Sequence, residues 1–385
     1  MEIFEQNTEL TKLQKIVFLL ICLVLCYFYL YHAFLFLQFK IYTIKISQMI
    51  LVALTTSTTI LVFVQSYKSW TIVEYVLLAT LFLLALSDQK IFGTSWIKVK
   101  GLYWGFFAVA MGVIISEKKV PNWVFLIPLI VISITIIIHH FILEERVASC
   151  IFEVNRNRFA MICLTFGLLN TFNSFVKQNI DLYILISPIV VVLLNFYSKS
   201  RAGLLSSVIF LVAVVFLYIE HLIKIRKKIK HEKNSKKYIA SVVLIIIAIS
   251  SLTVITVGCS RLGQIGFSPN GRKEIYLSFF HDLTFKKIVF GFRPSILDKF
   301  SHVHNSYFQL IAQLGLLSLV FITAIFQSSL YFLKHCKILF LFMGIITLYS
   351  FMDHFMFFRP GDLIVFPLII YAYREKRIKN RSIHL

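Results

Sequence analysis

The sequence predicts an all-α, polytopic integral membrane protein with about twelve membrane-spanning helices, the bilayer setting a length of roughly 20 apolar residues for each. Of its residues, 58% are hydrophobic and 15% charged, whereas soluble domains have roughly 45–50% and 25%. Long apolar runs recur along the whole chain. These runs are apolar on all sides, which distinguishes them from the alternating strands of a membrane barrel. We therefore expect residues 1–385 to form a single membrane domain.

Each long apolar run is a candidate membrane span. The first follows a polar stretch containing Glu2, Glu5 and Glu9, without a small-residue cleavage site, so we expect a retained span and not a removed signal peptide. The predicted spans are residues 15–38, 45–66, 70–88, 101–116, 122–143, 159–176, 181–197, 203–223, 238–258, 305–332, 335–352 and 360–374.

Clusters of Lys and Arg predict the orientation of the chain. The loop 224–237 holds eight Lys or Arg, and the tail beginning at Arg374 holds five in eight residues; such clusters mark the cytoplasmic side. An even number of spans places both clusters and the N-terminus on that side, although loops near 88–100 and 144–158 carry some Lys and Arg on the outer side. This loop pattern indicates topology and contact with membrane lipids. No zinc spacing or basic groove accompanies it, so nucleic acid is not an expected partner.

The outer face contains the longest polar connection in the chain. Residues 259–304 lie between the ninth and tenth predicted spans, and connections of that length are usually functional or disordered. Aromatic pairs, Pro269 and two histidines within the segment predict that it is ordered, which favours a functional loop. The shorter loops around 197–201 and 353–359 are expected on the same face.

Two of these outer elements contain a prominent arginine. In SKSRAGLLS, Arg201 stands directly before the eighth span; such a residue is often an interfacial anchor, but Gly203 would allow close approach of a ligand or another helix. In SPNGRKEIYLSFF, Arg272 follows a Pro-Asn-Gly turn signal. A loop arginine is often a solvated surface charge, yet its planar fork also matches phosphate oxygens.

A third outer element, SHVHNSYFQLIAQLGLL, combines histidines with the start of a helix. Apolar residues recur at helical spacing after Asn305 and Ser306, either of which could be the N-cap. His302 and His304 precede them, and a neutral imidazole can accept a proton. The His-x-His pair could equally be half of a metal site, although no matching carboxylate or cysteine spacing accompanies it.

Three segments resemble the signature elements of the O-antigen ligase and O-antigen polymerase family: SRAGLL, GRKEIY and HVHNSYFQLIAQLGLL. They occur in the family's order, and all three are expected on one membrane face. The resemblance covers the C-terminal half by motif and the N-terminal half only by topology. It implies a glycosyltransferase of the bacterial inner membrane that needs no metal and no cofactor. Its donor would be a glycan on undecaprenyl diphosphate at the periplasmic face, and its acceptor the lipid A core.

The resemblance also implies roles for individual residues. By motif match, Arg201 and Arg272 would bind the diphosphate and stabilise the negative charge of the leaving group. His304 would be the general base that deprotonates the acceptor hydroxyl, with His302 the weaker candidate. Attack on the anomeric carbon would then invert its configuration in a single displacement.

A fourth element, MDHFMFFRPGDLIVFPL, adds Asp353, His354, Arg359 and Asp362 on the same face. Charged residues at span ends are costly in lipid and often functional, but here they could also pair with one another in the interface. Arg359 is predicted to assist substrate binding, as are Asn305 and His302.

Three functions fit these features. The leading one is an O-antigen ligase, which transfers a finished polysaccharide to the lipid A core in lipopolysaccharide biosynthesis. A polymerase of the same family would join lipid-linked repeat units with the same residues. The third, a flippase or transporter of lipid-linked sugars, would need charges lining a path through the membrane, and the middles of the predicted spans are nearly free of them.

Overall fold

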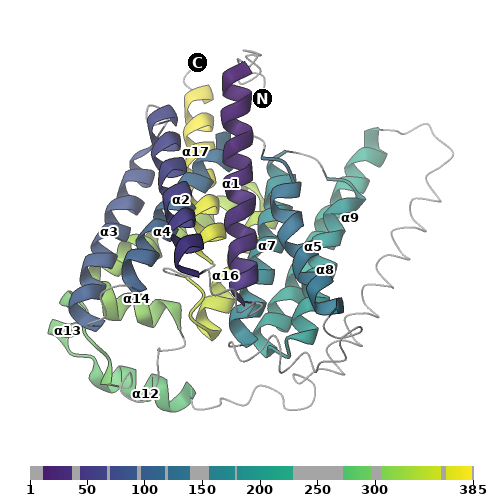
Figure 1. Cartoon of the computed structure of the whole chain (residues 1–385). Coiled ribbons are helices and arrows are strands. Elements are labelled where there is room, and N and C mark those ends of the chain that lie inside the picture. Colours follow the sequence, from purple (N-terminus) through teal and green to yellow (C-terminus); the bar gives the residue numbers. More distant parts are fainter. Residues whose placement is uncertain are drawn as a thin grey trace.

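The computed structural model describes residues 12–36, 44–66, 70–92, 97–117, 120–138, 156–177, 180–228, 272–295, 305–356 and 361–383. Every element in these ranges is a helix, and most helices stand side by side in one bundle (Figure 1). The helices of the first half are α1 (Lys12–Phe36), α2 (Ile44–Ser66), α3 (Ile72–Phe92), α4 (Ile97–Glu117), α5 (Trp123–Ile137), α7 (Arg156–Val176), the short 3-10 helix η3 (Leu182–Leu185), α8 (Ile186–Tyr197) and α9 (Arg201–Lys228).

The second half has shorter helices at one end of the bundle. They are followed by three longer helices that return through it (Figure 1). These elements are α12 (Arg272–Asp282), α13 (Phe285–Phe290), α14 (Ser306–Leu314), the 3-10 helix η5 (Gly315–Leu317), α15 (Ser318–His335), α16 (Lys337–Met352) and α17 (Asp362–Ile383).

The apolar runs of the sequence correspond to these helices. Each predicted span overlaps helix in the described residues, except 238–258, which lies outside them, as do residues 37–38, 139–143 and 360 at the ends of other predicted spans. Four of the described segments are long and apolar enough to cross a membrane: Met49–Ser66, Phe159–Val176, Arg201–Ile223 and Ser306–His335. Other apolar helices are shorter, so the all-helical, membrane-type fold is confirmed and the predicted count of spans is not.

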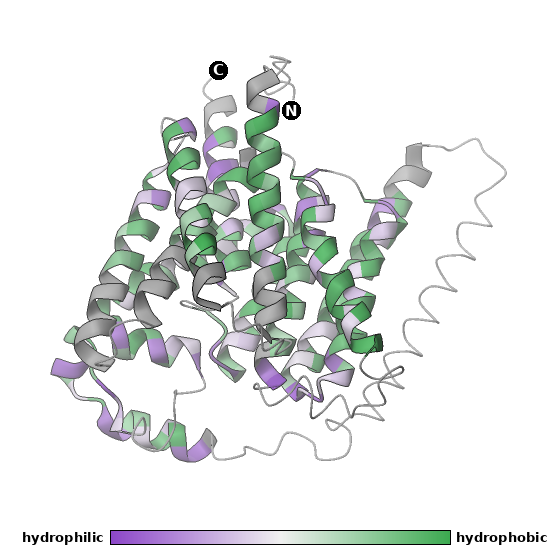
Figure 2. Cartoon of the chain, viewed as in Figure 1, coloured by the Kyte–Doolittle hydropathy of each residue, from purple (hydrophilic) through white to green (hydrophobic). Residues whose placement is uncertain are grey.

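The bundle has a buried centre, and many large apolar side chains are exposed on its outside. Figure 2 shows that hydrophobic residues run along most of the helices. Within α7, 89% of the apolar window Phe159–Val176 is buried inside the protein, compared with 28% of Met49–Ser66 in α2. Helices α4 and α17 approach closely because Gly112 has no side chain: a Cβ there would lie 3.0 Å from the Cα of Pro367. Small residues commonly allow such contacts between membrane helices.

Both described ends of the chain lie at one end of the bundle, as does the Lys228 end of α9, while α12 and α13 lie at the other (Figure 1). Arg374 corrects one expectation from the sequence. It was predicted to begin a basic tail, but α17 continues past it to Ile383 and buries it, with its Nε 2.7 Å from Oε1 of Glu74 in α3.

The predicted span 305–332 is not one continuous helix. Helix α14 ends at Gly315, which has a φ of +54°, and a 3-10 turn leads into α15. Glycine adopts this backbone conformation without steric cost. A side chain at Gly315 would also collide with the carbonyl oxygen of Val289 and lie 2.7 Å from the backbone nitrogen of Gly291. The break therefore lets α13 dock where α14 meets α15.

Candidate functional site

Four polar residues meet at the end of the bundle where α7, α9 and α14 begin. The Ser200 hydroxyl donates to Oδ1 of Asn157 (2.8 Å), and Nδ2 of Asn157 donates to Oδ2 of Asp353 (2.6 Å). The Ser306 hydroxyl donates to the backbone oxygen of Asp353 (3.2 Å). We call these four residues the polar junction. It ties together three of the elements singled out in the sequence.

The polar junction also fixes the turn that follows α16. The Ser306 hydroxyl accepts hydrogen bonds from the backbone nitrogens of Phe355 (2.8 Å) and Met356 (3.1 Å). Oδ1 of Asp353 accepts one from the nitrogen of His354 (2.8 Å). Ser306 and Asp353 are both buried, where an unsatisfied polar group would cost about 1–3 kcal/mol. These contacts therefore hold the turn in one conformation.

Arg201 is the first residue of α9, and its side chain is half-buried. Ser200 caps the helix, because its hydroxyl accepts from the nitrogen of Gly203 (3.2 Å) and its carbonyl from Leu204 (2.9 Å). A cation at a helix N-terminus opposes the helix dipole by about 0.3–1 kcal/mol. The helix dipole thus disfavours the charge of Arg201 at this position, whereas it favours a bound anion.

Gly203 serves packing between helices. A Cβ at this position would collide with the Cβ of Ala160 in α7, so the missing side chain lets α7 and α9 approach closely. This contact brings Asn157, near the start of α7, within reach of Ser200. Of the two partners that the sequence allowed for Gly203, a ligand or another helix, the structure places a helix there.

Asn305 is the N-cap of α14, which confirms the capping role proposed from the sequence. Its Oδ1 accepts from the backbone nitrogens of Tyr307 (2.9 Å) and Phe308 (3.2 Å), and its Nδ2 lies 3.4 Å from the backbone oxygen of Phe351, to which it donates. Asn305 is buried. Its predicted contact with substrate stays a prediction.

The outer segment, residues 272–295, packs against α14. Its Tyr276 donates from the phenol to the backbone oxygen of Phe351 (3.0 Å), the carbonyl that Asn305 also uses. The ring of Phe279 stacks on that of Phe308 with centroids 4.7 Å apart. The buried residues of this small core are Ile275, Phe279, Phe292 and Ala312. GRKEIY and HNSY, distant in the sequence, are therefore neighbours in space.

The turn between α12 and the end of the outer segment is closed by Asp282. Its Oδ2 accepts hydrogen bonds from the backbone nitrogen (2.7 Å) and the hydroxyl (2.8 Å) of Ser295. Partial burial raises the pKa of the Asp282 carboxyl, but the bonds from Ser295 and the charges of Lys287 and His281 outweigh it. The net result is a pKa below the usual value.

Because this pKa is lowered in the folded state, Asp282 stabilises the turn above the unfolded pKa, near 3.8. That contribution is lost as the pH falls through the lower folded value. We expect Asp282→Asn to speed hydrogen exchange of the Ser295 amide about tenfold at neutral pH, in line with the loss of a hydrogen bond to a charged group. Exchange measured by mass spectrometry would test this, and an unchanged rate would contradict it.

The remaining predicted site residues are described only in part. Arg272 begins α12 within the described residues, and its side chain is not among those described. His302, His304 and Arg359 lie outside the described residues. Asp362 is buried in the first turn of α17.

The sequence reasoning missed several residues of this site. Ser200 and Tyr276 lay within the quoted motifs without a role, and Ser306 was named only as a possible helix cap. A serine directly before a helix is a recognisable capping signal, so Ser200 was open to prediction. Asn157 carried no such signal, because its importance arises from helices that are distant in the sequence.

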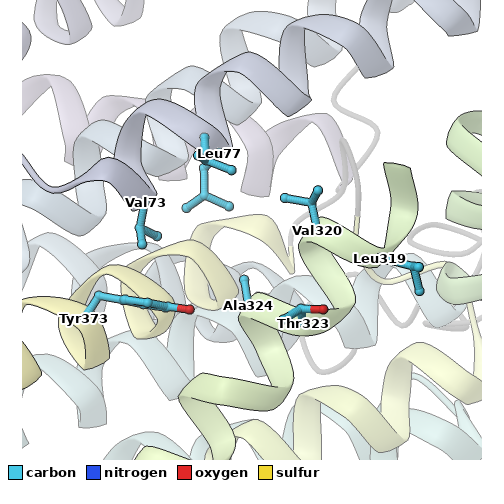
Figure 3. Close-up of a pocket in the computed structure, with 8 residues that line it drawn as sticks. Val73, Leu77, Leu319, Val320, Thr323, Ala324 and Tyr373 are labelled. Atoms are coloured by element: carbon cyan, nitrogen blue, oxygen red, sulfur yellow. The ribbon is translucent and has the colours of Figure 1, made fainter. Parts of the chain in front are cut away.

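A separate apolar groove of about 390 Å³ lies between α3, α15 and α17 (Figure 3). Its polar atoms come from the hydroxyls of Thr323 and Tyr373 (Figure 3), and the Tyr373 hydroxyl donates to Oε1 of Gln327 (2.5 Å). The lining residues are Val73, Val76, Leu77, Leu319, Val320, Thr323, Ala324 and Tyr373. None of them belongs to the polar junction, so this groove does not supply the candidate chemistry.

No protein-family model matches the chain, and no curated protein matches its sequence.

Proposed function

We propose that the chain is an O-antigen ligase, transferring a polysaccharide from undecaprenyl diphosphate to the lipid A core oligosaccharide at the periplasmic face of the bacterial inner membrane. The supporting observation is the meeting of four sequence elements at one end of the bundle. SRAGLL contributes Ser200, GRKEIY contributes Tyr276, HNSY contributes Asn305 and Ser306, and MDHF contributes Asp353. Hydrogen bonds join these elements through α7 and α16.

The arginines would hold the donor. In the proposal, Arg201 and Arg272 bind the diphosphate oxygens through their guanidinium groups, and the N-terminal ends of α9 and α12 add positive potential. As the glycosidic bond breaks, negative charge grows on the diphosphate, and fixed cations stabilise that charge without reorganisation. The arginines thereby supply the positive charge that a metal ion provides in other transferases.

His304 would activate the acceptor. It directly precedes Asn305, the N-cap of α14, and in the proposal its imidazole takes the proton of an acceptor sugar hydroxyl. The hydroxyl oxygen then forms a bond to the anomeric carbon of the donor glycan. The bond from that carbon to the diphosphate breaks, and undecaprenyl diphosphate leaves with the electron pair. One displacement of this kind inverts the anomeric configuration.

Deletion of the gene tests the proposal. We expect bare lipid A core on a polysaccharide gel, with the finished glycan accumulating on its lipid carrier in the periplasmic leaflet. Core that carries one repeat unit would instead identify a polymerase, and accumulation of lipid-linked glycan in the cytoplasmic leaflet would identify a flippase. Unchanged surface polysaccharide would contradict all three.

A further inference from the structure

Helix α13 carries large apolar side chains on its outer side. Phe285 is 84% exposed and Phe290 74% exposed, and Ile288 is also exposed. The sequence of the helix is FKKIVF, so half of its residues are aromatic or β-branched groups that remain uncovered by the described part of the chain. Exposed apolar groups gathered in so short a segment mark an interaction surface.

The apolar surface of α13 continues into the membrane-spanning part of the bundle. The carbonyl of Val289 and the nitrogen of Gly291 lie against Gly315, the first residue of η5. The next residues of η5, Leu316 and Leu317, are about half exposed, and they lie within the segment Ser306–His335 that is long and apolar enough to span a membrane. They stand directly before α15, at the end of the bundle where α13 docks. Exposed leucines at the start of an apolar helix are expected to face lipid, which would put α13 level with the edge of the bilayer.

Positive charge accompanies these apolar groups. Lys286 is exposed, and Lys287 is half-buried with its Nζ 5.4 Å from the centre of the Phe292 ring. Helix α13 contains no acidic residue. Apolar and aromatic side chains combined with lysines are typical of segments that lie in the headgroup layer, where lysine meets anionic phosphate.

We propose that α13 is an interfacial anchor that inserts Phe285, Ile288 and Phe290 at the boundary between lipid headgroups and acyl chains, with Lys286 at the lipid phosphates. Its partner is the surface of the membrane that holds the bundle. By holding α13, the lipid would also hold the outer segment against α14. This inference concerns membrane contact alone and does not depend on the proposed transferase activity.

A second copy of the chain is the main competing partner for this surface. Helix α13 has only six residues, whereas a stable protein interface uses roughly 20–30 residues on each side. The continuity with lipid-facing Leu316 and Leu317 also favours lipid over protein.

The test places tryptophan on α13 in the full chain, reconstituted in lipid nanodiscs. We expect brominated phosphatidylcholine to quench the tryptophan fluorescence of Phe290→Trp at least about twofold more than that of Phe279→Trp. We expect aqueous iodide to quench the tryptophan of Phe290→Trp only weakly, as for an interfacial aromatic group. Phe279 is the matched control because it is buried within the small core of the outer segment. The four native tryptophans give a background that is subtracted with the unmodified chain.

Two results would overturn the anchor. Strong quenching by iodide without quenching by brominated lipid would place α13 in water, and quenching by neither would place it under protein. Phe285→Trp repeats the measurement at an independent position in case Phe290→Trp does not fold. In discs containing phosphatidylglycerol, adding Lys286→Glu to Phe290→Trp should raise quenching by acrylamide, a neutral aqueous quencher, about twofold, as expected from loss of attraction to anionic lipid. No increase would contradict the contact between Lys286 and lipid phosphate.

Discussion

Arg201→Ala, Arg272→Ala and His304→Ala are each expected to lower glycan transfer by at least roughly a hundredfold. Removing one fixed group that stabilises developing charge costs about 10²–10³ in rate, and removing a general base costs about 10²–10⁴. Because a cation at this position opposes the dipole of α9, the dipole itself is not weakened by the loss of Arg201. Reduced transfer with retained folding would thus separate a chemical role from a structural one.

The measurement uses purified protein in vesicles, an undecaprenyl-diphosphate-linked glycan, lipid A core acceptor and EDTA throughout. Lys273→Ala is the matched control, because Lys273 is an exposed cation next to Arg272 in the same turn of α12. We expect it to transfer glycan at close to the normal rate. Near-normal transfer by Arg272→Ala or His304→Ala would contradict the assigned roles, and no transfer by the unmodified protein in EDTA would contradict a reaction without metal.

The helices were predictable from the sequence because the bilayer sets their length. A run such as 203–223 must be helical to satisfy its backbone in lipid, and α9 covers it. The break at Gly315 was not predictable, since glycine occurs within spans without breaking them. The close approach of Val289 and Gly291 leaves no room for a side chain at position 315, and that approach arises only in the folded chain.

In the candidate site, contacts between sequence neighbours could be predicted, and contacts between distant residues could not. The capping role of Asn305 follows from its position before an apolar helix, so it could be predicted from neighbouring residues. The bond between Asn157 and Asp353 joins residues 196 positions apart. Apolar periodicity indicates which face of a helix is buried and does not indicate which helices adjoin. The partners within the polar junction therefore required the structure.

The burial of Glu74 was not predicted either, because the sequence does not indicate that α3 and α17 adjoin. Substitution of Glu74 has the largest expected effect on stability. Glu74 is fully buried, with Oε1 2.7 Å from Nε of Arg374. Its other oxygen accepts from the backbone nitrogen (2.8 Å) and the hydroxyl of Thr71. Glu74→Ala would leave the buried guanidinium without this carboxylate. We expect a loss of roughly 3–5 kcal/mol in the free energy of unfolding.

A double-mutant cycle distinguishes this ion pair from simple loss of packing. Glu74→Gln and Arg374→Met should each destabilise the protein, whereas the double variant should recover much of the loss, because replacing both members of a buried pair is often nearly neutral. Lys376→Met is the control, since Lys376 is an exposed cation on the same helix. Unfolding in detergent, followed by circular dichroism, gives the four values. Additive losses in the double variant would mean that the two charges do not stabilise each other, and that α3 and α17 are held together by their apolar contacts alone.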